Sequence, residues 1–323
     1  MINWKSYLKA NIISWLLEED NPSVRYFTLI DLLEKPKYNL ELIQTRKDIL
    51  QRGIVPVIFS RQQEEGYWGE EEKYYTNKYR GTVWQLLILA ESGIEKEDDA
   101  RVEKACKFIL EHAQDKKRYG FSVYHSAKAG GGRSNSVIPC LTGNMVFSLI
   151  RLGFYADERV QKAIQWIITY QRFDDGNYRL PDDWPYDKSD LGCWGKHSCH
   201  MGVVKTLKAL AEIPINLKNE EINRTIEIAV DYLLKHHIYK KSHDLKKIAK
   251  PGWLRLGFPL MYQTDILEIL EILTKLGYRD NRMQDAIDIL ISKQDNQGKW
   301  IMENTFNDRF LVNIEKKESL VNG

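Results

Sequence analysis

The side chains best suited to chemistry lie in two short segments that resemble each other. The first is Cys140-Leu-Thr-Gly143 and the second is Cys199-His-Met-Gly202, and their cysteines stand 59 residues apart. Thiolate sulfur and imidazole nitrogen are preferred zinc ligands in proteins. A site made of Cys140, Cys199 and His200 leaves the fourth position open, as catalytic zinc sites do. We therefore expect one zinc ion between the two segments.

Two further residues near the second segment are alternative ligands. Cys193 and His197 lie a few positions before Cys199, and a loop that folds back would let either replace Cys199 or His200. Free cysteines often only pack in the core, so a site without metal stays open as well. Cys106, on a predicted outer helix, is expected to be such a core residue.

A repeat of about sixty residues must position these segments. Four amphipathic segments have apolar anchors spaced 58, 62 and 61 residues apart, and each follows a more apolar helix. Three of the apolar helices end at glycine, which is typical of a left-handed C-cap, and an acidic residue or Asn then caps the next helix. The anchors are Val102, Val160, Ile222 and Met283. An all-α fold follows, in which apolar helices form an inner ring inside an outer ring.

The predicted helices divide the chain into three parts. Residues 1–53 supply N-terminal helices that pack on the ring or complete it, residues 54–300 form the ring, and residues 301–323 form a tail. Within the first part, helical patterns cover residues 4–19, 21–33 and 40–52.

A glutamine, polar residues, a glycine and an aromatic residue follow several outer helices. The segments are Gln63-Glu-Glu-Gly-Tyr-Trp68, Gln171-Arg-Phe-Asp-Asp-Gly-Asn-Tyr178 and Gln294-Asp-Asn-Gln-Gly-Lys-Trp300. They resemble the Gln-Trp repeats of squalene and hopene cyclases, and the hairpins over roughly 54–300 resemble the α/α-toroid superfamily. That superfamily includes the β subunits of protein prenyltransferases and the lanthionine synthetase cyclases. The resemblance implies an α/α toroid in which the glutamines link neighbouring hairpins.

The cysteines extend this resemblance. One Cys and a later Cys-His pair resemble the lanthionine cyclases, in which zinc activates a substrate thiol. The segments Gly131-Gly-Arg-Ser-Asn-Ser-Val-Ile-Pro-Cys140 and His197-Ser-Cys199 resemble prenyltransferase motifs more loosely. The resemblance implies a terpenoid cyclase- or prenyltransferase-like enzyme with zinc at the cavity mouth, acting on an apolar or thiol-bearing substrate. The alternatives are a metal-independent terpene cyclase-like enzyme and a non-catalytic ligand-binding toroid.

Four further residues are candidates for substrate binding. Tyr79 and Arg80 precede an inner helix at positions that match the two cysteines within a residue, and Trp84 lies on that helix. Arg133 lies on a glycine-rich loop that opens a helix, where a guanidinium can hold an anion.

Four residues are candidates for acid or base chemistry. Tyr262 precedes the last inner helix in the same register, and His125, Asp187 and Asp190 lie in polar loops that lead to the same rim. A reaction at a thiol needs such a proton donor or acceptor.

Composition narrows the classes of partner. The formal net charge is +2, from 47 Lys and Arg against 45 Asp and Glu, so a basic surplus for nucleic-acid binding is absent. The sequence contains neither a signal-peptide pattern nor an apolar stretch of transmembrane length. We expect a cytoplasmic protein with a small-molecule or peptide substrate in its central cavity.

Overall fold

The computed structural model describes residues 4–176, 182–186, 193–306 and 308–314. Its N-terminal part contains short helices only: η1 (Trp4–Tyr7), α1 (Ile13–Leu16), α2 (Pro22–Phe27), η2 (Thr28–Leu32), α3 (Leu40–Ile49) and α4 (Ile54–Phe59). The predicted helices over 21–33 and 40–52 are confirmed within a few residues, the first with Pro22 at its first position. The helix predicted over 4–19 is wrong, because residues 8–12 are not helical and the backbone N–H of Lys9 donates to Gln294 instead.

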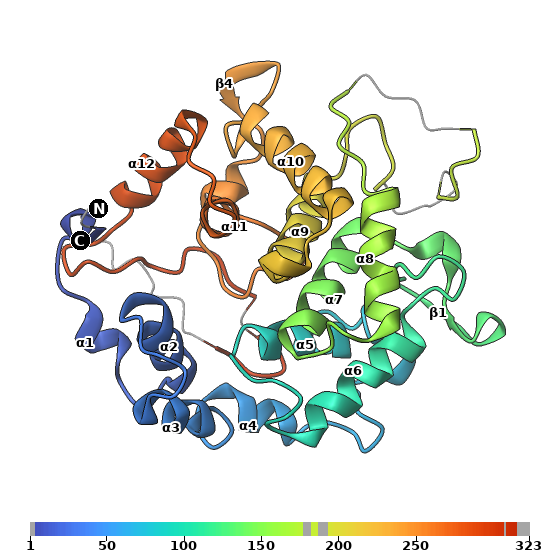
Figure 1. Cartoon of the computed structure of the whole chain (residues 1–323), viewed down its shortest axis with the longest axis horizontal. Helices are drawn as coiled ribbons and strands as arrows, with labels where there is room; N and C mark the ends of the chain where they lie inside the picture. The colour runs from blue at the N-terminus through green and yellow to red at the C-terminus, as the bar shows by residue number, and fades with distance from the viewer. Residues whose placement is uncertain (1–3, 177–181, 187–192, 307, 315–323) are drawn as a thin grey trace.

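Four helical hairpins follow, as the repeat predicts. Their bounds are α5 (Thr82–Ala90) with α6 (Ala100–His112), α7 (Pro139–Arg151) with α8 (Glu158–Tyr170), α9 (His200–Ala211) with α10 (Glu220–Lys235), and α11 (Ile266–Lys275) with α12 (Gln284–Ser292). Figure 1 shows α6, α8, α10 and α12 at the periphery and α5, α7, α9 and α11 nearer the centre. Every residue of α5 is buried, whereas α6 buries one face. The fold is therefore an all-α toroid with inner and outer helices.

The predicted caps set the ends of these helices. Gly93, Gly153 and Gly277 have φ values of 87°, 88° and 83°, the left-handed conformation that a C-cap glycine adopts. Asp99 and Asp157 accept hydrogen bonds from backbone amides at the starts of α6 and α8. Local sequence signals therefore set where each inner helix ends and where the following outer helix begins.

Glutamines link neighbouring hairpins. Gln62 Nε2 donates to Arg101 O at 3.0 Å and Gln114 Nε2 donates to Arg159 O at 2.8 Å, each joining the end of one outer helix to the start of the next. The sequence motif had indicated Gln63 for the first link, and Gln114 had been missed. At the last link, Gln294 Oε1 accepts from Lys9 N. The N-terminal segment therefore closes the ring against α12.

The remaining elements are short. They are η3 (Glu71–Lys73), β1 (His125–Ser126), η4 (Ala127–Ala129), β2 (Gly131–Gly132), η5 (Ser134–Ser136), η6 (Ile215–Leu217), β3 (Lys240–Lys241), β4 (Asp244–Ile248), η7 (Pro251–Leu254) and η8 (Asn281–Met283). β1 pairs with β2 and β3 with β4, both antiparallel. No helix in the described ranges is both long and apolar enough to cross a membrane.

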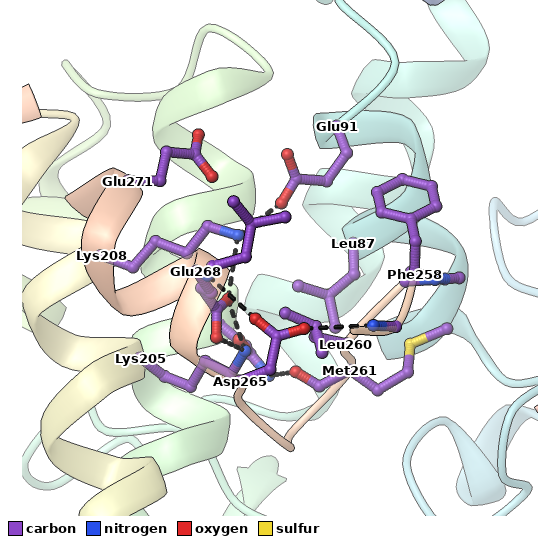
Figure 2. A pocket seen from close by; sticks show the side chains of 14 residues that line it. Leu87, Glu91, Lys205, Lys208, Phe258, Leu260, Met261, Asp265, Glu268 and Glu271 are labelled. Carbon is purple, nitrogen blue, oxygen red and sulfur yellow. Dashed lines mark hydrogen bonds and ion pairs between the residues drawn. The ribbon is translucent and has the colours of Figure 1, made fainter. Parts of the chain in front are cut away.

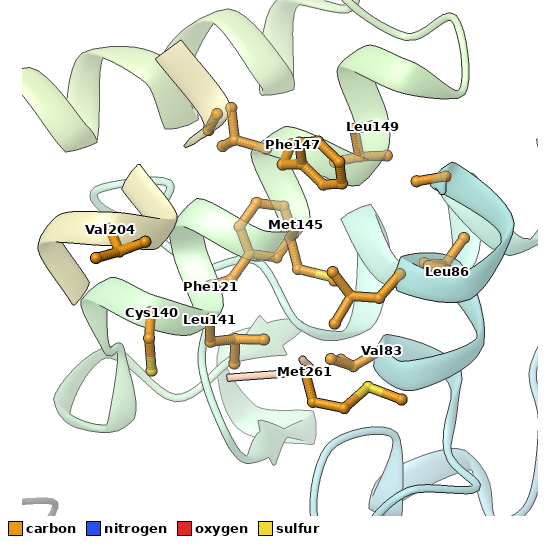
Figure 3. Packing of buried hydrophobic residues seen from close by; sticks show 14 of the residues in the cluster. Val83, Leu86, Phe121, Cys140, Leu141, Met145, Phe147, Leu149, Val204 and Met261 are labelled. Carbon is orange, nitrogen blue, oxygen red and sulfur yellow. The ribbon is translucent and has the colours of Figure 1, made fainter. Parts of the chain in front are cut away.

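The core lies between the inner helices. Figure 3 shows Val83 and Leu86 of α5 facing Leu141 and Met145 of α7. On the other side of α7, a Cβ at Gly143 would lie 2.4–2.6 Å from backbone atoms of α9, so these two helices pack backbone against backbone. This contact holds the first turns of α7 and α9 side by side.

The described part of the C-terminal tail packs on the start of α5. The rings of Phe306 and Phe310 lie 4.3 and 5.8 Å from that of Tyr79, measured between centroids. Tyr79 N also donates to Arg309 O at 3.3 Å. The tail therefore contributes to the same end of the ring as the predicted site.

Candidate functional site at the inner-helix ends

Three thiols meet at the amino-terminal ends of α7 and α9. Cys140 lies in the first turn of α7 and Cys199 is the N-cap of α9. The Cys193 thiol is hydrogen-bonded to Cys199, the charge of Cys199 raises the pKa of Cys140, and the charge of Cys140 raises the pKa of Cys193. None of the four cysteines forms a disulfide. Figure 3 shows the Cys140 sulfur pointing away from Met145 and the packed cluster.

One of these thiols is acidic. The hydrogen bond from Cys193 is the largest cause that lowers the pKa of Cys199 to about 6, against the opposing effect of burial. Backbone amides of Met201 and Gly202 lower this pKa further, as expected at a helix N-terminus. Burial and the charge of Cys199 raise the pKa of Cys140 to about 12. The hydrogen bond and the helix N-terminus therefore favour the thiolate at Cys199 over a thiolate at Cys140.

The two predicted histidines lie apart from this thiol cluster. The ring of His200 stacks on Trp253 at 4.0 Å between centroids. Burial, with the charges of His236 and Lys250, lowers the pKa of His200 to about 3, so it is a neutral imidazole. Its Nε2 is buried without a hydrogen-bond partner. His197 is exposed, with Nδ1 3.6 Å from Asp175 Oδ1.

In the structure, Cys193 rather than His200 therefore lies beside Cys140 and Cys199. Within the described ranges, no group of three or more His, Cys, Asp or Glu side chains has the spacing of a metal site. Zinc binding therefore requires the three sulfur atoms to move closer together.

Aromatic rings form a wall beside the thiols. The rings of Tyr79 and Trp84 lie 5.1 Å apart and those of Trp84 and Tyr262 lie 6.3 Å apart, between centroids. Burial raises the pKa of Tyr75, and the charge of Cys140 raises it further, so this ring lies near the thiols. Lys78 Nζ lies 4.8 Å from the Tyr75 ring and 4.5 Å from the Tyr262 ring. The predicted residues Tyr79, Trp84 and Tyr262 therefore lie together, as their shared register with the cysteines indicates.

Sequence analysis had missed Lys78. It directly precedes Tyr79 and therefore shares the register that identified the wall. The positive charge of its ammonium group lowers the pKa of Cys140, so Lys78 acts electrostatically on the thiol cluster.

The other candidates have different surroundings. His125 Nδ1 contacts His112 O of α6 at 3.1 Å. Arg133 is exposed, with its guanidinium 5.6 Å from the centroid of the Tyr124 ring. Arg80 is exposed as well, and its Nη2 donates to Asp308 O at 3.4 Å. Asp187 and Asp190 lie outside the described residues.

A cavity lies between the inner helices, and its ionic lining is not among the sequence-based predictions. All four inner helices and the loop over 257–261 enclose it, with a volume of about 110 Å³. Figure 2 shows ionic side chains converging on it. Lys205 Nζ lies 2.7 and 2.8 Å from the two carboxylate oxygens of Glu268, and both side chains are 2% exposed. Lys208 Nζ lies 3.1 Å from Glu268 and 2.5 Å from Glu91. These charged residues lie within otherwise largely apolar inner helices, and that pattern in the sequence could have indicated them.

A buried acid lines the same cavity. Asp265 Oδ1 accepts from Glu268 N at 2.9 Å and Oδ2 accepts from Gly257 N at 3.1 Å. Burial raises the pKa of Asp265 to about 6 despite these hydrogen bonds. Asn144 Nδ2 donates to Met261 O at 3.0 Å and so holds the loop against α7. The centre of the ring is consequently largely filled.

Comparison with solved structures gives a distant likeness. A variant of a type II terpene cyclase from Scytonema, solved with its product merosterolic acid A, aligns with a TM-score of 0.32 and 12% identity, covering 80% of this chain and 84% of that one. No protein-family model and no curated sequence matches. A likeness at this level says nothing of the reaction, so function must be argued from this chain's own residues.

The arrangement offers two kinds of chemistry. At the mouth, an ionised thiol lies beside aromatic rings and one ammonium group, which suits nucleophilic attack or metal binding. In the centre, the cavity is smaller than the engineered cavity of about 150 Å³ that holds benzene. An isoprenoid chain therefore exceeds the free space in the centre, whereas Cys193 and Cys199 at the inner-helix ends are partly exposed.

Proposed function

We propose that this toroid is a terpenoid cyclase- or prenyltransferase-like enzyme that reacts an apolar or thiol-bearing substrate at the thiol cluster, with zinc as its cofactor. The observation that carries the proposal is the meeting of Cys140, Cys193 and Cys199 at two helix N-termini. A structural cysteine is normally buried and protonated. The thiolate at Cys199 is therefore better explained by reactivity than by packing.

The donor chemistry fits zinc. Three thiols provide soft sulfur ligands, and the surroundings of Cys199 lower its pKa, which favours the thiolate that binds metal. Cys140, Cys193 and Cys199 would hold the ion, with His200 as the alternative nitrogen donor. Zinc bound there would lower the pKa of a coordinated substrate thiol and make it a nucleophile.

The surrounding residues have separate roles in this proposal. The partly exposed ring of Tyr262 supplies apolar surface for the substrate, and the buried rings of Tyr75 and Trp84 pack behind it. The ammonium group of Lys78 stabilises negative charge that develops at the thiols. The substrate lies at the mouth, because the centre of the ring offers only about 110 Å³.

Metal analysis tests this proposal directly. Protein purified without chelator should carry close to one zinc per chain by elemental analysis, and Cys140→Ala and Cys199→Ala should each lose it. Cys106→Ala is the matched control, because Cys106 is fully buried on α6 and distant from α7 and α9 in the fold. Substoichiometric zinc in the native protein, or full zinc in Cys140→Ala, would refute the metal part of the proposal.

A metal-independent reaction in the cavity is a second candidate, and Asp265 favours it. A carboxyl group with a pKa near 6 can act as a general acid close to neutral pH. Turnover that survives Cys140→Ser but is lost in Asp265→Asn would favour this candidate over the thiol cluster.

A further inference from the structure

Cys193 and Cys199 stand opposite each other across a tight hairpin. Trp194 and Ser198 form an antiparallel bridge, so the next residues outward, Cys193 and Cys199, are directly opposed. Opposed residues in an antiparallel pair have Cα atoms about 4.5–5.5 Å apart. A disulfide spans Cα separations of about 4.4–6.8 Å. The backbone therefore already has the spacing that a disulfide needs.

Other contacts hold the two sulfur atoms in this arrangement. The Cys193 thiol is hydrogen-bonded to the Cys199 sulfur, and backbone amides of Met201 and Gly202 also reach that sulfur. The hairpin is fixed on its other side, since Ser198 N donates to Asp174 O at 2.8 Å. Both cysteines are half-buried, whereas Cys106 and Cys140 are buried. A small oxidant thus reaches this pair first.

We propose that Cys193 and Cys199 are a peroxide-reactive dithiol that closes to a disulfide. The Cys199 sulfur attacks the O–O bond of a hydroperoxide, its proton passes to the leaving oxygen, and the sulfenic acid and water or an alcohol form. The Cys193 thiol then attacks the sulfenic sulfur, the S–S bond forms, and water leaves with the thiol proton. The peroxide is reduced by two electrons and the two thiols are oxidised by two.

This inference goes beyond the proposed enzyme activity and does not need zinc. It has a consequence for the zinc site all the same, because the disulfide removes two of the three sulfur donors and leaves Cys140 alone. Oxidation and zinc binding therefore exclude each other if both occur.

Thiol counting on the full chain tests the dithiol. Reduced protein is stripped of metal by a chelator, treated with hydrogen peroxide, unfolded in guanidinium chloride so that the buried Cys106 and Cys140 become accessible, and then alkylated with N-ethylmaleimide, and intact mass spectrometry counts the alkylated cysteines. We expect two of the four cysteines to escape alkylation and peptide mapping to join Cys193 to Cys199. Cys106→Ala should form the same disulfide. In Cys193→Ser, the Cys199 sulfenic acid should persist and be trapped by dimedone.

Two results would overturn the inference. One is a Cys140–Cys199 disulfide in place of the expected pair, and the other is four alkylated thiols after peroxide treatment that oxidises a free low-pKa thiol. Metal analysis of a sample that never met chelator is read separately. Absence of zinc there would count against the proposed function and leave the dithiol result intact.

Discussion

Replacement of Glu268 by Gln should destabilise the protein strongly. Lys205 is 2% exposed and has both of its short ionic contacts, 2.7 and 2.8 Å, to this one carboxylate. Removal of the charge leaves an ammonium group buried without its counterion. Loss of one partner from a buried ion pair costs ~3–5 kcal/mol. We expect the free energy of unfolding of Glu268→Gln to fall by this amount.

Companion variants separate charge from packing. Lys205→Met should cost less, because Glu268 keeps Lys208 at 3.1 Å. Lys205→Met combined with Glu268→Gln should cost less than the sum of the two single changes, with a coupling of roughly 0.5–3 kcal/mol. Glu158→Gln is the matched control, because Glu158 pairs with Lys162 on the exposed face of α8. The control should change stability by at most ~0.5 kcal/mol.

Urea unfolding followed by far-UV circular dichroism measures all four variants at pH 7. A shift of the midpoint at constant slope reports the change in stability. If Glu268→Gln costs no more than Glu158→Gln, Lys205 is not dependent on Glu268 and the electrostatic account of the cavity is wrong. Additive single and double changes would contradict the direct pairing.

Three further predictions concern Asp265, the contact of α7 with α9, and Cys199. Burial raises the pKa of Asp265 from 3.8 to about 6, so relative to Asp265→Asn the native protein should lose roughly 2 kcal/mol as pH rises from 4 to 6, which is about two thirds of the full linkage at ~1.36 kcal/mol per pKa unit. Urea titrations at both pH values check this, and parallel curves for the two proteins would refute it. Gly143→Ala should cost ~1–3 kcal/mol by overpacking against α9, whereas Gly195→Ala, with open space around it, should be neutral in the same thermal-unfolding assay. Iodoacetamide should label Cys199 with a half-maximal rate near pH 6 while Cys140 stays unlabelled, and a peptide map showing the reverse order would contradict the assigned thiolate.

The helical hairpins could be predicted from sequence because their signals are local. Apolar spacing, the glycines at 93, 153 and 277 and the capping Asp residues each act within one or two turns, and the helices begin and end where these signals place them. The N-terminal segment failed for the opposite reason. Its residues 8–12 read as helix, but Lys9 donates its backbone N–H to Gln294, 285 residues away. A contact between chain ends cannot be read from periodicity.

The candidate site divides along the same line. The sixty-residue register identified Cys140, Cys199 and the aromatic residues, since equivalent positions of adjacent inner helices lie at one end of the ring. The repeat register does not fix the direction of a side chain within a loop. The structure accordingly places Cys193, rather than His200, beside Cys140 and Cys199. The pairing of Lys205 with Glu268 was missed because it joins residues 63 positions apart.

The ionic network and the thiol cluster act on each other through α9. Lys205 follows Cys199 by less than two helical turns, and its positive charge lowers the pKa of Cys140 against burial and the charge of Cys199. Glu268 partly neutralises that charge, so a carboxylate on α11 limits how far the thiols ionise. The backbone contact at Gly143 fixes the spacing of α7 and α9 on which this field depends. A change in the packed centre therefore reaches the chemistry at the mouth through charge as well as through stability.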